Sequence, residues 1–324
     1  MLPVDLVVSQ DLSDMDFLLF VIGVALVLIG ADVFTDGASK LARYMRVSEL
    51  VIGLTIVSFG TSAPEMFTSV VSALKGANGL ALGNVIGSNI FNTTLIVGCS
   101  AAVAIIPVLP ITIKRDIPFA VIATALLCIF SLDGEINRID SGLLLLLFIA
   151  FMVFTLHSSK KDAVTADQPM DKPTAKSYLR CIFWIVGGLA MLVFGSNLFV
   201  ESATAIAHRF HISETFIGLT IVAGGTSLPE LATSIVAARK GQSGIAIGNV
   251  VGSNVFNILF VLGLSGLIAP LSVADTSWVD FFVISATVLL VWWLSYTKYE
   301  INHKEGWSLI VVYFLYLVYL LYHI

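Results

Sequence analysis

The blocks VIGLTIVSFGTSAPE at 51–65 and LALGNVIGSNIFN at 80–92 return as FIGLTIVAGGTSLPE at 216–230 and IAIGNVVGSNVFN at 245–257, each 165 positions later. Apolar membrane segments converge on Leu, Ile and Val by chance. A constant offset that also matches Gly, Pro, Asn, Thr and Glu indicates a duplicated unit. The first block of each copy ends in Pro-Glu inside an apolar run. An ionisable residue at such a position predicts a functional site.

The composition predicts a polytopic membrane protein. Of the 324 residues, 57% are hydrophobic and 12% are charged, and the mean hydropathy is +0.96, far from the values of a soluble domain. Ten apolar runs have about the 17–25 residues that cross a hydrocarbon core. They lie at 16–38, 50–74, 79–100, 116–132, 141–157, 179–202, 215–238, 244–269, 279–297 and 306–322. The expected fold class is therefore all-α, with ten transmembrane helices.

The distribution of basic residues predicts how these spans are oriented. Of the 17 Lys and Arg residues, 14 fall in intervals that follow an odd-numbered span. Cytoplasmic loops carry the excess of Lys and Arg in membrane proteins. We therefore expect these intervals to lie in the cytoplasm and both termini to lie outside it.

The longest polar interval, 158–178, divides the chain into two halves of five spans. It holds two prolines and charges of both signs, as is typical of a linker, and it is expected in the cytoplasm. Because five is odd, the half at 179–324 starts on the opposite side of the membrane from the half at 1–157, so the repeats are inverted. Their central regions are 51–98 and 216–263. Inverted repeats predict a substrate site near the membrane midplane.

A proline is expected to break the second and seventh helices, at the centre of the protein, beside each glutamate. Proline has no N–H to donate, and its ring crowds the carbonyl four residues earlier. Carbonyls freed at membrane depth need a new partner, such as a neighbouring helix, water or a bound cation. Thr61 and Glu65 are four residues apart, as are Thr226 and Glu230, so each pair shares one helical face. Each broken helix should offer a stripe of oxygen atoms.

The second blocks add oxygens with the same spacing. Ser88 and Asn92 are four residues apart, as are Ser253 and Asn257. Folding the halves around a pseudo-twofold axis would gather these side chains with the two Thr/Glu pairs. Hydroxyl, amide and carboxylate oxygens are hard ligands that suit Ca²⁺ and Na⁺. The blocks contain no histidine, so a zinc site would lack ligands, and no cofactor is expected.

Other polar residues in the apolar runs have structural interpretations. Four further asparagines are expected to hydrogen-bond between helices rather than to ligate an ion. They are Asn84, Asn89, Asn249 and Asn254. Asp32 and Asp36 lie near the end of the first span, where a role in facing water or capping a helix is expected.

The two glutamates favour exchange over uniport. Together they carry a charge of −2, which one divalent or two monovalent cations would neutralise. An unpaired buried charge is costly. The empty site would therefore need protonation, hydration or reloading before the carrier reorients.

At these residues the sequence resembles the sodium/calcium exchanger superfamily, whose repeats carry G-T-S-x-P-E and G-N-x-x-G-S-N-x-x-[ND]. The resemblance covers nearly the whole chain and is to the prokaryotic calcium/sodium antiporters related to potassium-dependent exchangers. It implies ten helices and secondary active exchange of Na⁺ for Ca²⁺ by alternating access across the cytoplasmic membrane. The expected partners are the lipid bilayer and the two substrate ions, and the protein is expected to work as a monomer.

The resemblance also implies a role for each matching position. Calcium would be held by Thr61, Glu65, Thr226 and Glu230. The sodium sites would use these four residues together with Ser58, Ser62, Ser88, Ala223, Ser227 and Ser253. Ser58 and Ala223 would contribute freed backbone carbonyls, and Asn92 and Asn257 would line the centre. Family members often carry an acid at the position of Asn257, so this chain lacks one titratable group.

Three other functions are compatible with the same residues. In Ca²⁺/H⁺ exchange the glutamates would carry protons, although the serine-rich sodium positions favour Na⁺. A cation channel would use the oxygens to line a continuous pore. An intramembrane enzyme would use Glu65 and Glu230 as an acid/base pair, but the sequence supplies no metal triad or Gly-x-Ser-x-Gly elbow. Nucleic-acid binding is not expected, because the basic residues are spread over short loops.

Overall fold

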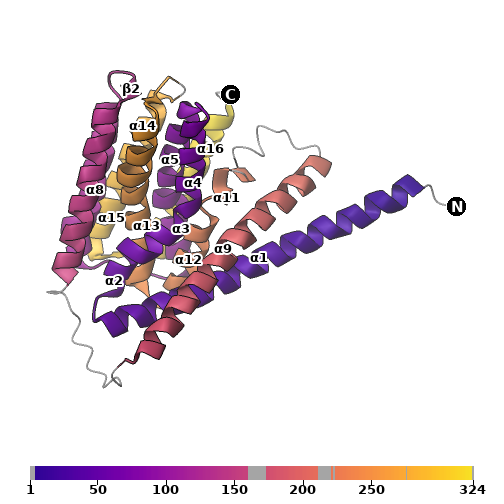
Figure 1. Ribbon diagram of the computed structural model, residues 1–324, viewed down its shortest axis with the longest axis horizontal. Coiled ribbons are helices and arrows are strands. Elements are labelled where there is room, and N and C mark those ends of the chain that lie inside the picture. Colours follow the sequence, from indigo (N-terminus) through magenta and orange to yellow (C-terminus); the bar gives the residue numbers. More distant parts are fainter. Residues whose placement is uncertain (1–3, 160–172, 211–219, 222, 275, 323–324) are drawn as a thin grey trace.

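Helices dominate the computed structural model, which describes residues 4–159, 173–210, 220–221, 223–274 and 276–322 (Figure 1). Seven of the described helices are long and apolar enough to cross a membrane. An eighth span is formed by the segments Glu49–Thr61 and Ala63–Leu74, which meet at a bend of 47°. The all-α polytopic class and a broken second helix are thus confirmed.

Two of the ten predicted spans are not among these eight. The run at 116–132 corresponds to η3 (Thr112–Asp116), a π-helical segment, and α7 (Ile117–Phe130). This helix contains three consecutive charged residues near its start, which makes it less apolar than the others. The run at 215–238 lies partly outside the described residues. The count of ten therefore remains a prediction.

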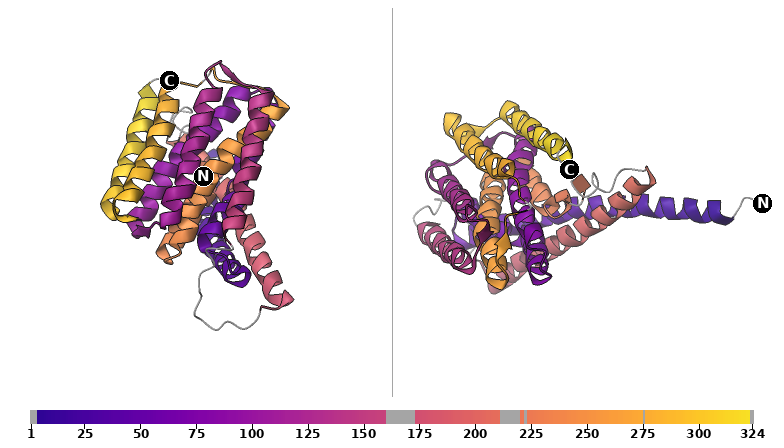
Figure 2. Two further views of the ribbon diagram at one scale, coloured as in Figure 1. Left: turned by 90° about the vertical axis from the view of Figure 1, so that its left-hand side faces the viewer. Right: turned by 90° about the horizontal axis from the view of Figure 1, so that it is seen from above.

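Two long helices form a pair along one side of the molecule. α1 (Val4–Met45) and α9 (Ala175–Arg209) lie side by side and extend beyond the other helices in Figures 1 and 2. Their close approach depends on glycine. A Cβ atom added to Gly30 would lie 2.9 Å from the Gly188 carbonyl oxygen, and one added to Gly195 would lie 3.0 Å from the Gly23 carbonyl oxygen. Small residues of this kind allow membrane helices to pack backbone against backbone.

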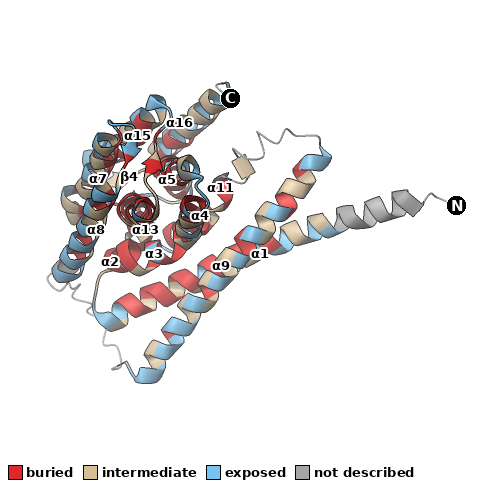
Figure 3. Cartoon of the chain, turned by 45° about the horizontal axis from the view of Figure 1, so that its top comes forward, coloured by how far each residue is buried: buried red, intermediate tan, exposed pale blue. Residues whose placement is uncertain are grey.

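The repeated blocks form the central helices. The first copy comprises α2 (Glu49–Ile52), η1 (Gly53–Val57), α3 (Ser58–Thr61), α4 (Ala63–Leu74), α5 (Asn78–Phe91), η2 (Asn92–Ile96) and α6 (Val97–Val103). The second copy, where described, comprises α11 (Ala223–Gly225), α12 (Leu228–Arg239), α13 (Ser243–Val255), η5 (Phe256–Leu262) and α14 (Gly263–Ile268). Figure 3 shows α13 among the most buried of the labelled helices. The π-helical segments η2 and η5 begin at or just before the predicted central asparagines, and π-turns within helices are frequent at functional sites.

The remaining elements surround this centre. They are α8 (Arg138–Ser159), α15 (Trp278–Lys298), α16 (His303–Tyr322), β1 (Ile106–Pro107), β2 (Glu135–Ile136), β3 (Leu271–Ser272) and β4 (Glu300–Ile301). β1 pairs with β4 and β2 pairs with β3, both antiparallel, with Ile106 opposite Ile301 and Ile136 opposite Leu271. The offset of 165 converts each of these pairs into the other. Each short ladder therefore joins the two halves at equivalent positions, as a pseudo-twofold relation requires.

Candidate functional site

Both glutamates follow a helix break directly. Ser62 separates α3 from α4 in a non-helical conformation (φ −81°, ψ 8°), and Pro64 stands in the first turn of α4. Ser227 separates α11 from α12 in the same way (φ −90°, ψ 7°), again with a proline in the following turn. Proline fits there because first-turn N–H groups have no acceptor within the helix. Glu65 and Glu230 thus lie at the positive ends of α4 and α12, where a carboxylate is stabilised.

The serine of each break holds the glutamate of the other break. Ser62 Oγ donates a hydrogen bond to Glu230 Oε1 at 2.8 Å, and Ser227 Oγ donates one to Glu65 Oε1 at 2.8 Å. Both glutamates are fully buried, and the Glu230 carboxylate acts on Glu65 by charge repulsion. Oε2 of each glutamate has no hydrogen-bond partner among the described residues. One carboxylate oxygen from each half is therefore free to accept a cation.

The two threonines reach across the centre in the same way. Thr226 lies beside Glu65 and Thr61 beside Glu230, close enough for polar contact, although neither hydroxyl makes a well-formed hydrogen bond to the carboxylate. Thr61 Oγ1 has Val57 O at 3.1 Å and Asn249 Oδ1 at 3.0 Å, and its single proton can serve only one of them. The shared helical face predicted for each Thr/Glu pair therefore serves a site made from both halves.

The central asparagines turn their amide nitrogens away and keep an oxygen free. Asn92 Nδ2 donates to Asn254 Oδ1 at 3.1 Å, and Asn257 Nδ2 donates to Asn89 Oδ1 at 3.2 Å. The Oδ1 atoms of Asn92 and Asn257 are buried and have no hydrogen-bond partner in the described structure. Asn89 Nδ2 also bonds to the Asn254 carbonyl at 3.2 Å. The helix-bridging role expected of Asn89 and Asn254 is thus confirmed.

The other two asparagines brace the glutamates from behind. Asn84 Nδ2 donates to the Glu65 carbonyl at 3.3 Å and to Ser69 Oγ at 2.9 Å. Asn249 Nδ2 donates to the Glu230 carbonyl at 3.2 Å and to Ser234 Oγ at 2.9 Å. The sequence analysis did not single out either serine as a partner. Ser69 and Ser234 are themselves 165 residues apart, and this signal could have identified them.

Ser88 connects the site to a cavity of about 330 Å³ between α5, α15 and α16. Ser227 Oγ lies 3.3 Å from Ser88 Oγ, and Ser88 lines the cavity. Asp280 and Tyr316 also line it, and the Tyr316 hydroxyl donates to Asp280 Oδ1 at 2.7 Å. The sequence analysis did not single out Asp280, because its counterpart 165 residues earlier is Arg115 and the repeat gives no signal there.

Three more of the predicted sodium ligands have distinct surroundings. Ser253 Oγ is buried without a described hydrogen-bond partner. The Ser58 carbonyl accepts the Ser62 amide at 3.0 Å, so a cation would have to use its second lone pair. Ala223 begins α11, immediately after residue 222, which lies outside the described residues, and its side chain is not described either.

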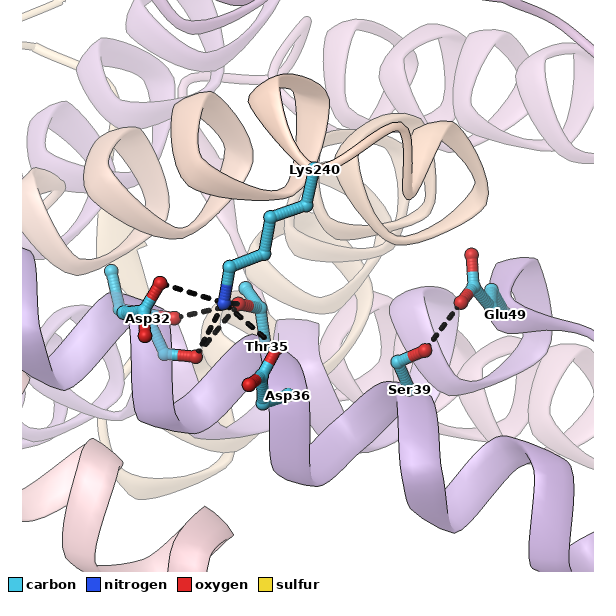
Figure 4. A network of polar contacts seen from close by, with 7 residues as sticks. Asp32, Thr35, Asp36, Ser39, Glu49 and Lys240 are labelled. Atoms are coloured by element: carbon cyan, nitrogen blue, oxygen red, sulfur yellow. Dashed lines mark hydrogen bonds and ion pairs between the residues drawn. The ribbon is translucent and has the colours of Figure 1, made fainter.

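The acids near the end of the first span belong to a separate network. Lys240 Nζ lies 2.7 Å from Asp32 Oδ1 and 2.8 Å from Asp36 Oδ1, and it also donates to Thr35 Oγ1 at 3.3 Å (Figure 4). Asp32 and Asp36 are partly exposed and engaged by this lysine. They join α1 to the end of α12, and they are not part of the central cluster.

Comparisons with known proteins agree with this geometry. The model of the sodium/calcium exchanger protein family matches residues 15–157 and 181–322. The sodium/calcium exchanger MaX1 of Methanosarcina acetivorans is 35% identical, over 95% of this chain and 99% of that protein. The inner membrane protein YrbG of Escherichia coli is 36% identical, over 78% of this chain and 79% of that protein. The solved structure of the sodium-calcium exchanger NCX_Mj, soaked with 10 mM Na⁺ and zero Ca²⁺, superposes with a TM-score of 0.82 at 32% identity, covering 94% of this chain and 98% of that one.

Proposed function

Because the chain belongs to the sodium/calcium exchanger family, and is therefore an integral membrane antiporter of Ca²⁺ and a second cation, we propose that the second cation is Na⁺. One observation carries this proposal: a cluster of buried oxygens at the centre has no hydrogen-bond partner among the described residues. The cluster consists of Glu65 Oε2, Glu230 Oε2, Asn92 Oδ1, Asn257 Oδ1, Thr226 Oγ1 and Ser253 Oγ. Unpaired buried polar atoms are costly unless a ligand satisfies them, and oxygen-only surroundings suit Ca²⁺ and Na⁺.

The proposed ligands of Ca²⁺ are Thr61, Glu65, Thr226 and Glu230. The two carboxylates supply a charge of −2, which matches one Ca²⁺ ion. The proposed sodium sites share these four residues and add the side chains of Ser62, Ser88, Ser227 and Ser253 and the carbonyls of Ser58 and Ala223. Asn92 and Asn257 line the centre between them. Because both ions use the same carboxylates, their binding is mutually exclusive, and this makes exchange the natural mode of transport.

The hydroxyl groups favour Na⁺ over protons as the coupling ion. Ser62 and Ser227 each donate to one carboxylate oxygen, so their lone pairs remain available to a cation beside that carboxylate. A proton on the glutamate would need none of these hydroxyl ligands. Alternating access is proposed because the cavity reaches the cluster from the side of Ser88, whereas Ser253 is fully buried.

We place the protein in the cytoplasmic membrane, as a functional monomer with both termini outside the cytoplasm. The proposed organisation is a five-helix repeat at 1–157, a cytoplasmic linker at 158–178 and a second, inverted repeat at 179–324. The uneven distribution of Lys and Arg between successive loops supports this orientation.

Uptake of ⁴⁵Ca²⁺ into proteoliposomes tests the coupling ion. Vesicles loaded with Na⁺ should accumulate Ca²⁺ when diluted into Na⁺-free buffer, and vesicles loaded with choline should not. Uptake driven by a pH gradient alone would assign H⁺ instead and refute the sodium sites. Turnover at channel rates without any counter-ion would refute the carrier mechanism.

A further inference from the structure

A second cavity, of about 130 Å³, lies between the C-terminal end of α1 and the N-terminal end of α9, away from the central site. We call it the α1–α9 pocket. Its lining residues are Lys40 and Tyr44 from α1 and Ser177, Arg180, Cys181 and Trp184 from α9. In Figure 1 these helix ends lie at the lower left of the molecule, at its outer surface.

Positive charge is concentrated in the α1–α9 pocket. Lys40 Nζ lies 3.9 Å from the centroid of the Trp184 ring, and Arg180 Cζ lies 5.1 Å from the same centroid. Two cations thus share one aromatic ring, which orients both side chains toward the pocket. Arg43 is close enough to act electrostatically on Cys181 together with the other two. Three positive charges therefore converge on one small cavity.

The nearby acids are already engaged by other residues, as Figure 4 shows. Asp32 and Asp36 are bound by Lys240, and Glu49 Oε1 accepts a hydrogen bond from Ser39 Oγ at 2.5 Å. In the part of the chain that the structure describes, Lys40, Arg43 and Arg180 form no ion pair with a carboxylate. The positive charge of the pocket is therefore not compensated by the described acids.

Helix dipoles explain part of this arrangement but leave Arg180 unexplained. Lys40 and Arg43 lie near the C-terminal end of α1, where the helix dipole favours a cation. Arg180 lies near the N-terminal end of α9, which is capped by Thr174 and where the dipole favours an anion. An anion in the pocket would meet the Arg180 guanidinium, the Lys40 ammonium and the positive end of α9 together.

An apolar surface continues from the pocket along α9. Four large side chains there are at least half exposed: Leu179 (66%), Ile182 (50%), Phe183 (75%) and Val186 (60%). The rings of Tyr44 and Tyr178 contact each other edge to face beside the pocket, at 5.8 Å between centroids. Tyr and Trp are enriched where a membrane helix crosses the headgroup region. The pocket is thus placed at headgroup level, with an apolar surface on its membrane side.

We propose that the α1–α9 pocket binds the phosphate group of an anionic phospholipid. Arg180 and Lys40 hold the phosphate, and the acyl chains lie along the exposed apolar face of α9. Basic pockets between transmembrane helices recognise lipid headgroups in this way. The apolar surface favours a lipid over a soluble phosphate compound, because a soluble anion would leave these side chains without a contact.

The thermal stability of the full-length protein in detergent tests the proposal. We would measure its melting temperature as dioleoylphosphatidylglycerol is added, with dioleoylphosphatidylcholine as the uncharged-headgroup control. The wild-type protein should be stabilised by the anionic lipid at low mole fraction. A double variant, Lys40→Gln with Arg180→Gln, should need at least tenfold more of it. The charge-conserving pair Lys40→Arg with Arg180→Lys should respond like the wild type, and so should Lys298→Gln, which alters an exposed lysine outside the pocket.

Three outcomes would overturn the proposal. The first is an unchanged lipid response in the double variant. The second is an equal loss in Lys298→Gln, which would indicate diffuse charge attraction rather than a site. The third is equal stabilisation by glycerol 3-phosphate, which would assign the pocket to a soluble anion. If the double variant does not fold, Arg180→Gln alone alters an exposed side chain and supports the same comparison, with a smaller but still measurable loss expected.

Discussion

In the first copy of the repeat, Gly83 and Gly87 of α5 line the cavity beside Ser88, and no described atom lies within 4 Å of a Cβ added to either. In the second copy the equivalent glycines of α13 are tightly packed. A Cβ added to Gly248 would lie 2.8 Å from the Leu50 carbonyl oxygen, and one added to Gly252 would lie 2.7 Å from Ser58 Oγ.

The polar contacts do not share this difference. Ser62 and Ser227 each bond to the glutamate of the opposite half at the same distance. The chemistry of the site is thus repeated while the packing around it is not. An exchanger made of two equivalent halves has to be asymmetric in any single access state, because access from one side requires one half to be open and the other closed.

The largest effect is expected from Glu65→Gln and Glu230→Gln, and it tests whether the two halves are chemically equal. Each variant removes one charge from a buried pair of carboxylates. Disrupting a buried ion pair costs about 3–5 kcal/mol, so each should lower Na⁺-driven Ca²⁺ uptake by about 100-fold or more while the protein still folds. The control is Glu135→Gln, an exposed glutamate in β2. Retained transport in both variants would remove the glutamates from the site, and a loss in only one would disprove their equivalence.

The serines that bond to the glutamates sharpen the comparison. A hydrogen bond to a charged group contributes about 1.5–3 kcal/mol. Ser62→Ala should therefore raise the Ca²⁺ concentration for half-maximal uptake by about tenfold. Ser227→Ala should raise it further, because Ser227 also contacts Ser88 at the end of the cavity. A larger effect from Ser62→Ala would show that the cavity side does not limit binding.

The glycines test the packing side of the comparison. Gly252→Ala should destabilise the protein by about 1–3 kcal/mol, because overpacking forces α13 away from α3. Gly87→Ala should be neutral or slightly stabilising, since alanine is the better helix former by about 1 kcal/mol. Thermal unfolding of the two purified variants in the same detergent measures the difference. Equal melting temperatures would mean that the asymmetry is absent in solution.

The polar chemistry of the site could be read from the sequence, but its arrangement could not. The offset of 165 and the i,i+4 spacing identify Glu65, Glu230 and their hydroxyl partners, since both depend only on position along the chain. That Ser62 bonds to Glu230 rather than to its own neighbour depends on how α3 crosses α12. Such a crossing is set by packing between residues that are far apart in sequence.

The packing asymmetry was even less accessible. The two copies carry the same glycines at matching positions, so nothing in the residue types separates Gly87 from Gly252. The pairing of Asp32 and Asp36 with Lys240 was missed for a related reason. The sequence analysis treated those acids as water-facing or capping residues, because a partner 204 residues or more away leaves no local pattern.

Lys240 and its counterpart Lys75, 165 residues earlier, provide the smallest test of the comparison. Lys240 bridges α12 to Asp32 and Asp36 on α1, whereas Lys75 is exposed and makes no ion pair with any residue that the structure describes. Partly exposed ion pairs contribute about 0.2–1 kcal/mol each and are screened by salt. Lys240→Gln should therefore lower the melting temperature slightly at low ionic strength and hardly at all in 1 M salt, and Lys75→Gln should not lower it in either. Equal, salt-dependent losses in both variants would show that Lys75 has a partner of its own, and the two ends of the repeat would then be alike in charge pairing and differ only in packing.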